Sequence, residues 1–331
     1  MKSLIIGGAG FVGGYLIQHL STELNHEVVV TKLPHEKIEK PFLNQDTCAT
    51  DVEGLRVYDL DILQKDEIVK LLQMEKPDYI FHLAAQSSVA LSWKNPVLTV
   101  DVNIKGSINL LDAVRELNLS PRVLLIGSGE EYGNIKAEEL PITEDNCLRP
   151  GNIYAATKAC QNMIGKIYAD AYDMDIVMVR AFNHTGPNQS PVFVVADFCK
   201  QVADIEKGLQ EPIIRVGNLS AKRDFTDVRD VVRAYSLLME KGQKGQIYNI
   251  GSGNAIAIES ILQMVLSQAK CGIEVIVDSE KIRPVDVPVI EADTRKLYAD
   301  TQWRPEIEFE KTIQDTLEYY RENDYGLHER I

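Results

Sequence analysis

The sequence predicts an α/β fold of the Rossmann type, with a doubly wound parallel sheet and a smaller C-terminal α/β substrate domain. Short apolar runs alternate with segments whose apolar residues recur three or four positions apart. That alternation is typical of a parallel sheet covered by helices on both faces. A glycine-rich turn directly follows the first apolar run. The length of 331 residues allows about two domains, at roughly 150 residues each.

The apolar runs predict the strands, and apolar stripes predict the helices between them. Strands are expected at residues 4–6, 28–30, 79–83, 123–126, 176–180 and 247–250. Leu16, Leu20 and Leu24 form the helical stripe after the first strand. Residues 228–240 are expected to form a helix that returns the chain to the sheet. Beyond residue 251 the sequence predicts helix and loop.

Gly, Pro and Asn interrupt the alternation between residues 183 and 222, and this break predicts a domain boundary. We assign residues 1–182 and 226–250 to the sheet domain. Residues 183–225 and 251–331 are assigned to the substrate domain.

The composition is that of a globular protein with an excess of acidic residues. Lys and Arg number 35 against 49 Asp and Glu, so the net charge is −14. Such a polyanion repels nucleic acid and anionic membranes, and no apolar run approaches the ~18 residues of a membrane span. The five cysteines are spread without a C-x-x-C pair, and the histidines do not cluster with them. We therefore expect no metal, no disulfide framework and a cytoplasmic location.

The glycine-rich turn has the spacing G-x-x-G-x-x-G, with Gly7, Gly10 and Gly13 leading into a helical stretch. Glycines let the backbone turn tightly and approach a pyrophosphate closely, and the helix N-terminus offers unpaired N–H groups. We assign the turn, with Phe11 and Val12, to the cofactor site of an NAD(P)-binding domain. The alternative is a turn without a ligand, which the position between strand and helix disfavours.

The end of the second strand bears on the choice of cofactor. An acid is expected there for NAD, because it binds the ribose 2′-hydroxyl. This sequence has Thr31 and Lys32 instead. A hydroxyl and a cation suit a 2′-phosphate, which favours NADP(H) and leaves NAD(H) open. The alternative is that Lys32 is a solvated surface residue and either cofactor is accepted.

A Tyr-x-x-x-Lys pair opens a long helical stretch. Tyr154 and Lys158 are four residues apart and therefore share one helix face. An ammonium ~4 Å from the phenol contributes about 4 kcal/mol at an effective dielectric of 20, enough to lower the tyrosine pKa by up to about three units. The phenol can then exchange a proton with a sugar oxygen during hydride transfer. Ser128, at a strand end, is a third group that could polarise that oxygen; the pair alone also suits an ordinary amphipathic helix.

This set of residues resembles the extended short-chain dehydrogenase/reductases that act on nucleotide sugars, over nearly the full chain. The matching residues are the glycine turn, Asp61-Ile62, His82-Leu83-Ala84-Ala85, Asn103, Ser128 before Tyr132-Gly133, Tyr154 with Lys158, and Arg223-Asp224-Phe225-Thr226-Asp227-Val228. The resemblance implies an NAD(P)-dependent oxidoreductase of deoxysugar biosynthesis. It also implies that Asp61 and Ile62 flank the adenine, that Leu83, Ala84 and Ala85 line the cofactor channel, and that Asn103 contacts the cofactor region.

The substrate half narrows the resemblance. The strings HLAAQSSV, GSGEEYG, FNHTGPNQS, DFCKQ and RPVDVP are similar to those of GDP-4-keto-6-deoxy-D-mannose reductases. The implied substrate is a nucleotide-diphosphate sugar whose binding residues are Asn183, Lys200, Arg223 and Arg283 at the diphosphate and Asp286 at the ribose. The implied reaction is hydride transfer from NADPH to C4 of the keto sugar, with Tyr154 as proton donor. It gives GDP-D-rhamnose or its C4 epimer.

Two other functions are left open. Glu130 is a further candidate catalytic residue, because it stands where related 4,6-dehydratases keep the base that removes the C5 proton. GDP-mannose 4,6-dehydratase is therefore the alternative, although Gly129 departs from the dehydratase pattern and Glu130 could equally order the loop. A non-catalytic dinucleotide sensor is disfavoured because Tyr154 and Lys158 are present. The resemblance also implies a homodimer built on helices around residues 97–117 and 154–172.

Overall fold

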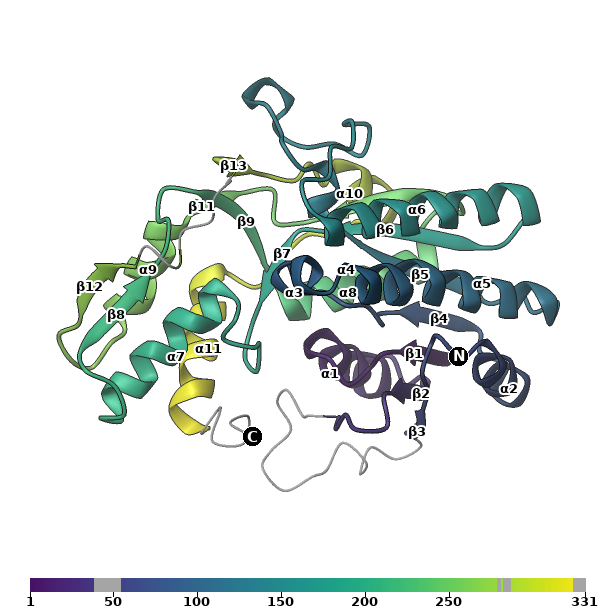
Figure 1. Cartoon of the computed structure of the whole chain (residues 1–331), viewed down its shortest axis with the longest axis horizontal. Helices are drawn as coiled ribbons and strands as arrows, with labels where there is room; N and C mark the ends of the chain where they lie inside the picture. The colour runs from purple at the N-terminus through teal and green to yellow at the C-terminus, as the bar shows by residue number, and fades with distance from the viewer. Residues whose placement is uncertain (39–54, 279–280, 282–286, 324–331) are drawn as a thin grey trace.

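The computed structural model describes residues 1–38, 55–278, 281 and 287–323. Its centre is a parallel sheet of seven strands in the order β10-β6-β5-β4-β1-β2-β3 (Figure 1). The strands are β1 (Lys2–Ile6), β2 (Glu27–Lys32), β3 (Arg56–Asp59), β4 (Tyr79–His82), β5 (Arg122–Ser128), β6 (Ile176–Ala181) and β10 (Ile247–Ile250). The chain starts at the centre, runs to one edge and then crosses to the other. The predicted fold class is confirmed, and all six predicted strands are found.

Alternate strand residues face opposite sides of the sheet, and both sides are buried. Ile5 packs toward one layer of helices, whereas Leu4 and Ile6 pack toward the other. The two layers are α1 (Phe11–Gln18), α8 (Val228–Lys241) and α10 (Arg295–Thr301) on one face, and α2 (Lys65–Glu75), α5 (Gly106–Glu116) and α6 (Ile153–Tyr172) on the other. This double burial explains why the strands read as continuous apolar runs.

Short helical segments complete this part of the fold. Between β4 and α5 lie α3 (Val89–Lys94), α4 (Pro96–Val100) and a π-helical segment at Asp101–Lys105. A second π-helical segment, His19–Glu23, extends α1, and 3₁₀ turns at Gly129–Tyr132 and Ala137–Glu139 follow β5.

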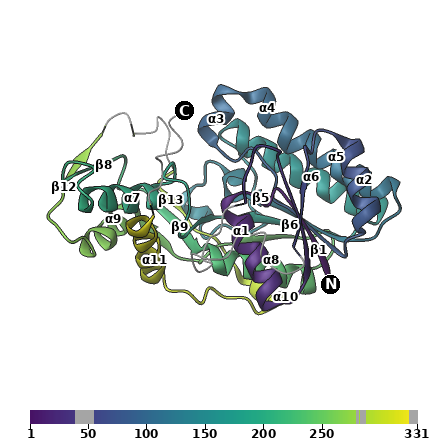
Figure 2. The same ribbon diagram turned by 90° about the horizontal axis from the view of Figure 1, so that it is seen from below.

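A smaller lobe lies to one side of the large sheet (Figure 2). One small sheet contains β7 (Asn183–Thr185), β9 (Lys222–Asp227), β11 (Ala255–Ala257) and β13 (Val289–Ile290), and β8 (Ile213–Val216) pairs with β12 (Glu274–Val277). Helices α7 (Val194–Glu206), α9 (Ile258–Ser267) and α11 (Phe309–Glu322) form its core with these strands. The prediction of helix and loop beyond residue 251 is wrong. The strands there have two to four residues and form by pairing with β8 or β9, so no local apolar run marks them.

The two-domain division is kept as a proposal. All strands of the large sheet fall within residues 1–182 and 226–250. Strand β9 runs across the predicted boundary at 225/226, because it pairs with β7, β11 and β13 in the smaller lobe and then leads directly into α8.

Within the described residues, Cys147, Cys160, Cys199 and Cys271 are free thiols, and Cys48 lies outside them. The cytoplasmic location stays a prediction. Among the helices of the described ranges, none is long and apolar enough to cross a membrane. Those same ranges hold no group of three or more His, Cys, Asp or Glu side chains that could bind a metal.

Candidate active site

The glycine turn lies at the carboxyl end of β1, against the segment that follows β4. Gly7 has a φ of +83°, and a Cβ on it would lie 2.6 Å from the backbone of Ala84, so glycine is required. The Gly8 N–H donates to the Thr31 carbonyl at 2.8 Å, and the Ala84 N–H donates to the Ile6 carbonyl at 2.8 Å. The structure thus brings the glycine turn and residues 83–85 together at one edge of the sheet.

The start of α1 has the shape of a diphosphate cradle. Gly10 is the N-cap residue and makes no side-chain capping bond, and a Cβ on it would meet nothing within 4 Å. A Cβ on Gly13 would lie 2.2 Å from the Gly8 carbonyl oxygen. The turn is therefore tightly packed behind and open in front, where the first-turn N–H groups can bind an anion. These residues fit the pyrophosphate of a nicotinamide dinucleotide.

In the structure Thr31 hydrogen bonds to the glycine turn, whereas the sequence predicted that it binds the cofactor. Its side chain is buried, and its hydroxyl accepts a hydrogen bond from the Gly7 N–H at 3.2 Å. The prediction that this hydroxyl binds a 2′-phosphate is therefore wrong, because β2 directs Thr31 inward to hold the glycine turn.

Lys32, the last residue of β2, makes an ion pair that the sequence did not indicate. Its Nζ lies 2.5 Å from Oδ1 of Asp59, its register partner on β3. In this fold the adenosine end of a dinucleotide lies at that edge of the sheet. Asp61 and Ile62 follow β3 there: Asp61 accepts from the Leu63 N–H at 2.9 Å, and Ile62 is buried.

Releasing Lys32 from Asp59 should tighten NADPH binding. An exposed ion pair is worth about 0.2–1 kcal/mol, so Asp59→Asn should lower the NADPH Kd by up to about fivefold, with little effect on NADH. Lys32→Ala should weaken NADPH and spare NADH. Fluorescence titration of each cofactor measures both effects, with Lys311→Ala in the smaller lobe as the control. Equal changes for the two cofactors would contradict a 2′-phosphate contact at Lys32.

Asn103 forms hydrogen bonds that link two segments of the chain. It is fully buried, its Oδ1 accepts from the Gln86 N–H at 2.8 Å, and its Nδ2 donates to the Gln86 carbonyl at 3.1 Å and the Thr157 hydroxyl at 2.9 Å. The contact with the cofactor region that the resemblance implies stays a prediction, since these three hydrogen bonds are all made within the chain. Asn103 fixes the segment after β4 to α6.

Ser128 and Tyr154 meet where β5 ends and α6 begins. Helix α6 starts there because Asn152 caps it, with Oδ1 accepting from the Ala155 N–H at 2.8 Å. The Ser128 side chain lies near enough to the Tyr154 phenol to act on its pKa. The predicted catalytic Ser and Tyr are therefore close together, one at the end of β5 and the other in the first turn of α6.

The electrostatics of Tyr154 differ from the prediction. Burial raises the pKa of Tyr154 to about 12; the Ser128 side chain opposes this rise, and the charges of Glu130 and Glu131 add to it. The expected lowering of this pKa by Lys158 is wrong for this structure. The phenol is accordingly a protonated acid throughout the neutral pH range.

Lys158 explains that difference. It lies on the same helix face as Tyr154, but its Nζ donates to the Ile126 carbonyl at 2.7 Å and to Gln161 Oε1 at 3.2 Å. Burial lowers the pKa of Lys158 to about 8, and the charge of Glu131 opposes that shift. The ammonium on α6 is thus held by a hydrogen bond to the backbone of β5.

Glu130 lies at the start of α6. Its Oε2 accepts from Nδ2 of the capping residue Asn152 at 3.2 Å. This contact orders the loop and also holds a carboxylate beside the helical turn that carries Tyr154. Both interpretations of Glu130 are compatible with it.

The predicted substrate residues Asn183, Lys200 and Arg223 lie in the smaller lobe. Asn183 is exposed on β7, whose register partner on β9 is Phe225, two residues beyond Arg223. Lys200 on α7 is ion-paired with Asp204 one turn along the helix. The other two predicted residues, Arg283 and Asp286, lie outside the described residues.

Contacts between the lobe and the glycine turn were missed at the level of sequence. The Phe11 ring stacks on His184 with centroids 6.4 Å apart, and the Tyr15 hydroxyl donates to the Pro187 carbonyl at 2.9 Å. Burial lowers the pKa of His184, which keeps the imidazole neutral. The string FNHTGPNQS drew attention to this segment. Nothing in its local sequence predicts that it packs against α1.

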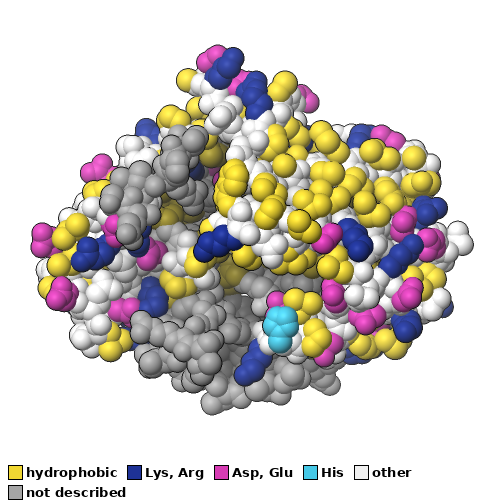
Figure 3. Space-filling view, in the orientation of Figure 1, with side chains coloured by type: hydrophobic (Ala, Val, Ile, Leu, Met, Phe, Trp, Pro, Cys, Tyr) yellow, Lys and Arg dark blue, Asp and Glu magenta, His cyan; other side chains and the backbone are white. Residues whose placement is uncertain are grey.

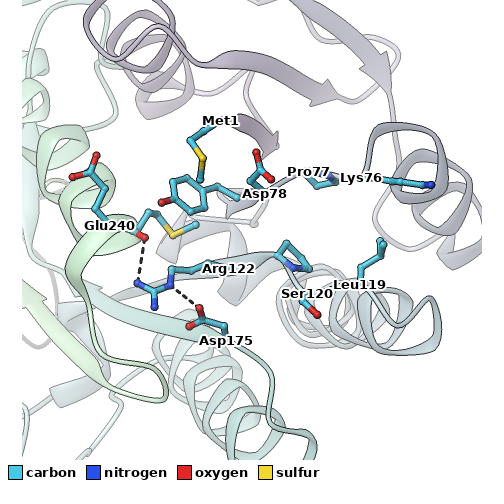
Figure 4. Close-up of a pocket in the computed structure, with 12 residues that line it drawn as sticks. Met1, Lys76, Pro77, Asp78, Leu119, Ser120, Arg122, Asp175 and Glu240 are labelled. Atoms are coloured by element: carbon cyan, nitrogen blue, oxygen red, sulfur yellow. Dashed lines mark hydrogen bonds and ion pairs between the residues drawn. The ribbon is translucent and has the colours of Figure 1, made fainter.

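A separate cavity of about 530 Å³ lies at the opposite, amino edge of the sheet (Figure 4). There the Arg122 Nε donates to Asp175 at 2.8 Å, and the Nη1 donates to the Met239 carbonyl at 3.2 Å. None of the predicted catalytic, cofactor or substrate residues lines it. Because doubly wound sheets bind ligands at the carboxyl ends of their strands, this cavity is not the candidate active site.

Comparison with known proteins finds relatives that are nucleotide-sugar enzymes with nicotinamide cofactors. Residues 4–316 match the family described as GDP-mannose 4,6 dehydratase. The chain is 32% identical over 257 residues to the GDP-6-deoxy-D-mannose reductase of Pseudomonas aeruginosa, covering 78% of this chain and 84% of that protein. The structure of RMD from Pseudomonas aeruginosa complexed with NADPH superimposes with a TM-score of 0.84 at 28% identity, covering 97% and 99% of the two chains. The UDP-glucose 4-epimerase of Thermus thermophilus, complexed with NAD, superimposes with a TM-score of 0.83 at 29% identity and the same coverage.

Proposed function

The chain belongs to the GDP-mannose 4,6 dehydratase family of extended short-chain dehydrogenase/reductases, which are NAD(P)-dependent enzymes, and we propose that it reduces the C4 keto group of GDP-4-keto-6-deoxy-D-mannose. The product is GDP-D-rhamnose, or its C4 epimer if the sugar presents its other face. The observation that carries this proposal is the 32% identity to a GDP-6-deoxy-D-mannose reductase.

The proposed mechanism assigns one task to each side chain. The nicotinamide cofactor, when bound, supplies the hydride. Tyr154, kept protonated by burial, donates its proton to the oxygen at C4, and Ser128 donates a hydrogen bond to the same oxygen. Lys158, cationic below its pKa of about 8, would bind the ribose of the nicotinamide half of the cofactor. The glycine turn holds the diphosphate of the cofactor.

The pH dependence of reduction should reflect Lys158. Tyr154, with a pKa of about 12, keeps its proton, whereas Lys158 loses its charge as the pH rises through about 8. The charged form is the useful one, so kcat/KM should be level below pH 8 and fall about tenfold per pH unit above it. Stopped-flow measurement between pH 6 and 10 tests this, and Lys158→Met should abolish the limb. A level profile to pH 10 would contradict the assignment.

A dehydratase is the second candidate, and the placement of Glu130 beside the start of α6 favours it. The two functions are separated by feeding substrates. With GDP-mannose and no added reductant, we expect no 4-keto product. With the keto sugar, we expect NADPH to be consumed in equal amounts. Formation of the 4-keto product would overturn the reductase proposal and support Glu130 as the C5 base.

We propose NADP(H) as the preferred cofactor and leave NAD(H) open. Lys32 supports this preference, and so does the bound NADPH in the Pseudomonas structure. The ion pair with Asp59 and the NAD in the Thermus epimerase support the use of NAD(H) as well.

We also propose a homodimer that buries an apolar face on α3, α4 and α6. Hydrophobic side chains gather over this region of the surface (Figure 3). The exposed residues of this face are Trp93, Val97, Leu98, Val100, Met163, Ile167 and Tyr172. Exposed apolar clusters rimmed by polar residues mark protein–protein interfaces.

Two charges placed on this face should separate the subunits. Val97→Glu/Ile167→Glu should shift sedimentation from dimer to monomer, because two carboxylates would have to lose water at a dry interface. Leu209→Glu, at an equally exposed site in the smaller lobe, is the control and should leave the mass unchanged. A monomeric unaltered protein would contradict the proposal.

A further inference from the structure

A buried carboxylate lies behind the candidate active site, and the mechanism above does not use it. Glu131 is fully buried in the turn that follows β5. Its Oε1 accepts from the Ser128 N–H at 2.9 Å and from Asn162 Nδ2 at 2.8 Å, and its Oε2 accepts from Arg180 Nε at 2.9 Å. One side chain therefore joins the end of β5, the middle of α6 and strand β6.

The backbone around Glu131 leaves just enough room for it. A Cβ on Gly127 would lie 2.3 Å from Glu131 Oε1 and 2.2 Å from Asn162 Nδ2. Glycine at the penultimate position of β5 therefore admits the carboxylate and its amide partner together. The contact between Glu131 and Asn162 therefore depends on the glycine at position 127 of β5.

The partners of Glu131 show which form of the carboxyl group the site holds. Burial raises the pKa of Glu131, and Arg180 opposes that shift. All three partners donate hydrogen bonds, and a protonated carboxyl group would leave one donor facing another. Arg180 is always charged, and its Nη1 donates onward to the Tyr132 hydroxyl at 2.9 Å. The site therefore holds the carboxylate.

The carboxylate also lies close to Lys158. Asn162, which binds Glu131, is one helical turn beyond Lys158 on the same face of α6, and the Glu131 charge acts on the Lys158 ammonium. The other titratable groups that face Lys158 from the described residues are His82 on β4 and Tyr154 on α6. Burial lowers the pKa of His82 to about 3 and raises the pKa of Tyr154 to about 12, so both are neutral. Glu131 is the charge that opposes the loss of the Lys158 proton.

We propose that Glu131 is a positioning residue of this active site, which fixes Ser128 against α6 and sustains the ammonium of Lys158 through its negative charge. The role of Glu131 in holding Ser128 against α6 rests on the hydrogen bonds alone. Its effect on the reaction rests on the proposed reductase function. The two are tested separately.

Two substitutions remove the charge with little change of shape. Glu131→Gln keeps an oxygen for Ser128 and Asn162. Glu131→Gln/Arg180→Met also removes the cation that would otherwise be buried without its partner. The matched control is Glu206→Gln/Arg321→Met, because those two residues form a largely buried pair at 2.8 Å in the smaller lobe. Circular dichroism establishes that each variant is folded.

The first readout needs no substrate. The Nζ of Lys158 is titrated in the full chain by ¹⁵N NMR, with its signal assigned from the spectrum of Lys158→Met. The midpoint should lie near pH 8 in the unaltered protein and the control. It should lie at least one pH unit lower in both Gln variants. An unchanged midpoint in a folded Gln variant overturns the proposal.

The second readout is kinetic. The alkaline limb of kcat/KM should move with the Lys158 midpoint, which is about a tenfold loss above pH 8 for a shift of one unit. Glu131→Asp keeps the charge and shortens the side chain, so it should retain the midpoint and lose kcat, with KM within about twofold. An Asp variant with normal kcat overturns the positioning role. If the unaltered protein does not turn over the keto sugar, the reductase proposal fails, and the NMR titration still decides the role of Glu131.

Discussion

Replacing Tyr154 by Phe is expected to lower kcat for reduction of the keto sugar by about 10²- to 10⁴-fold, the range typical of a lost general acid. The ring stays and only the hydroxyl is removed, so the packing at the start of α6 is preserved. The proton for the C4 oxygen must then come from water, which the partly buried site admits poorly. The Kd of NADPH, measured by fluorescence, should change by less than about twofold, because the phenol does not hold the diphosphate.

Tyr168 provides the matched control for this experiment. It lies almost four turns further along the same helix, and its hydroxyl donates to Asp112 on α5 at 2.9 Å. Tyr168→Phe should therefore keep kcat within a small factor. If Tyr154→Phe reduced the keto sugar at the normal rate, another group would be the proton donor.

The second large effect is expected at the glycine turn. Gly13→Ala would place a Cβ 2.2 Å from the Gly8 carbonyl oxygen, which is backbone and cannot move aside alone. The turn must open, so we expect a lower melting temperature and a loss of NADPH affinity of at least about 100-fold, since the cradle depends on close backbone approach. Differential scanning fluorimetry and fluorescence titration measure the two losses.

Gly10→Ala separates those two losses. Its Cβ would meet nothing within 4 Å, and its φ of −74° suits any residue. The folded protein should keep its melting temperature while NADPH binding weakens, because the methyl group would occupy the space in front of α1. Unaltered NADPH binding in Gly10→Ala would show that the diphosphate lies elsewhere.

The parts of the site that follow directly from local sequence could be predicted. Gly7 and Gly13 stand at positions where a side chain would clash with backbone, and Asn152 follows the ordinary rule for helix caps. Tyr154 and Lys158 share a helix face because of their spacing alone. These inferences need no knowledge of distant contacts.

The remainder depended on contacts between distant residues. The i, i+4 spacing places Lys158 near Tyr154, but the Ile126 carbonyl decides where the ammonium points. Lys32 reads as a free cation until β3 brings Asp59 alongside it. The pKa of Tyr154 is set by burial and by two acidic neighbours in the turn after β5, and no local pattern in the sequence shows how deeply this one phenol is buried.

The stacking of Phe11 on His184 and the bond from Tyr15 to the Pro187 carbonyl join the first two turns of α1 to the segment that carries the chain into the smaller lobe. Whatever occupies the glycine turn therefore acts on the orientation of the lobe that must grip the sugar nucleotide. By thermodynamic linkage the two ligands must influence each other's affinity by the same factor.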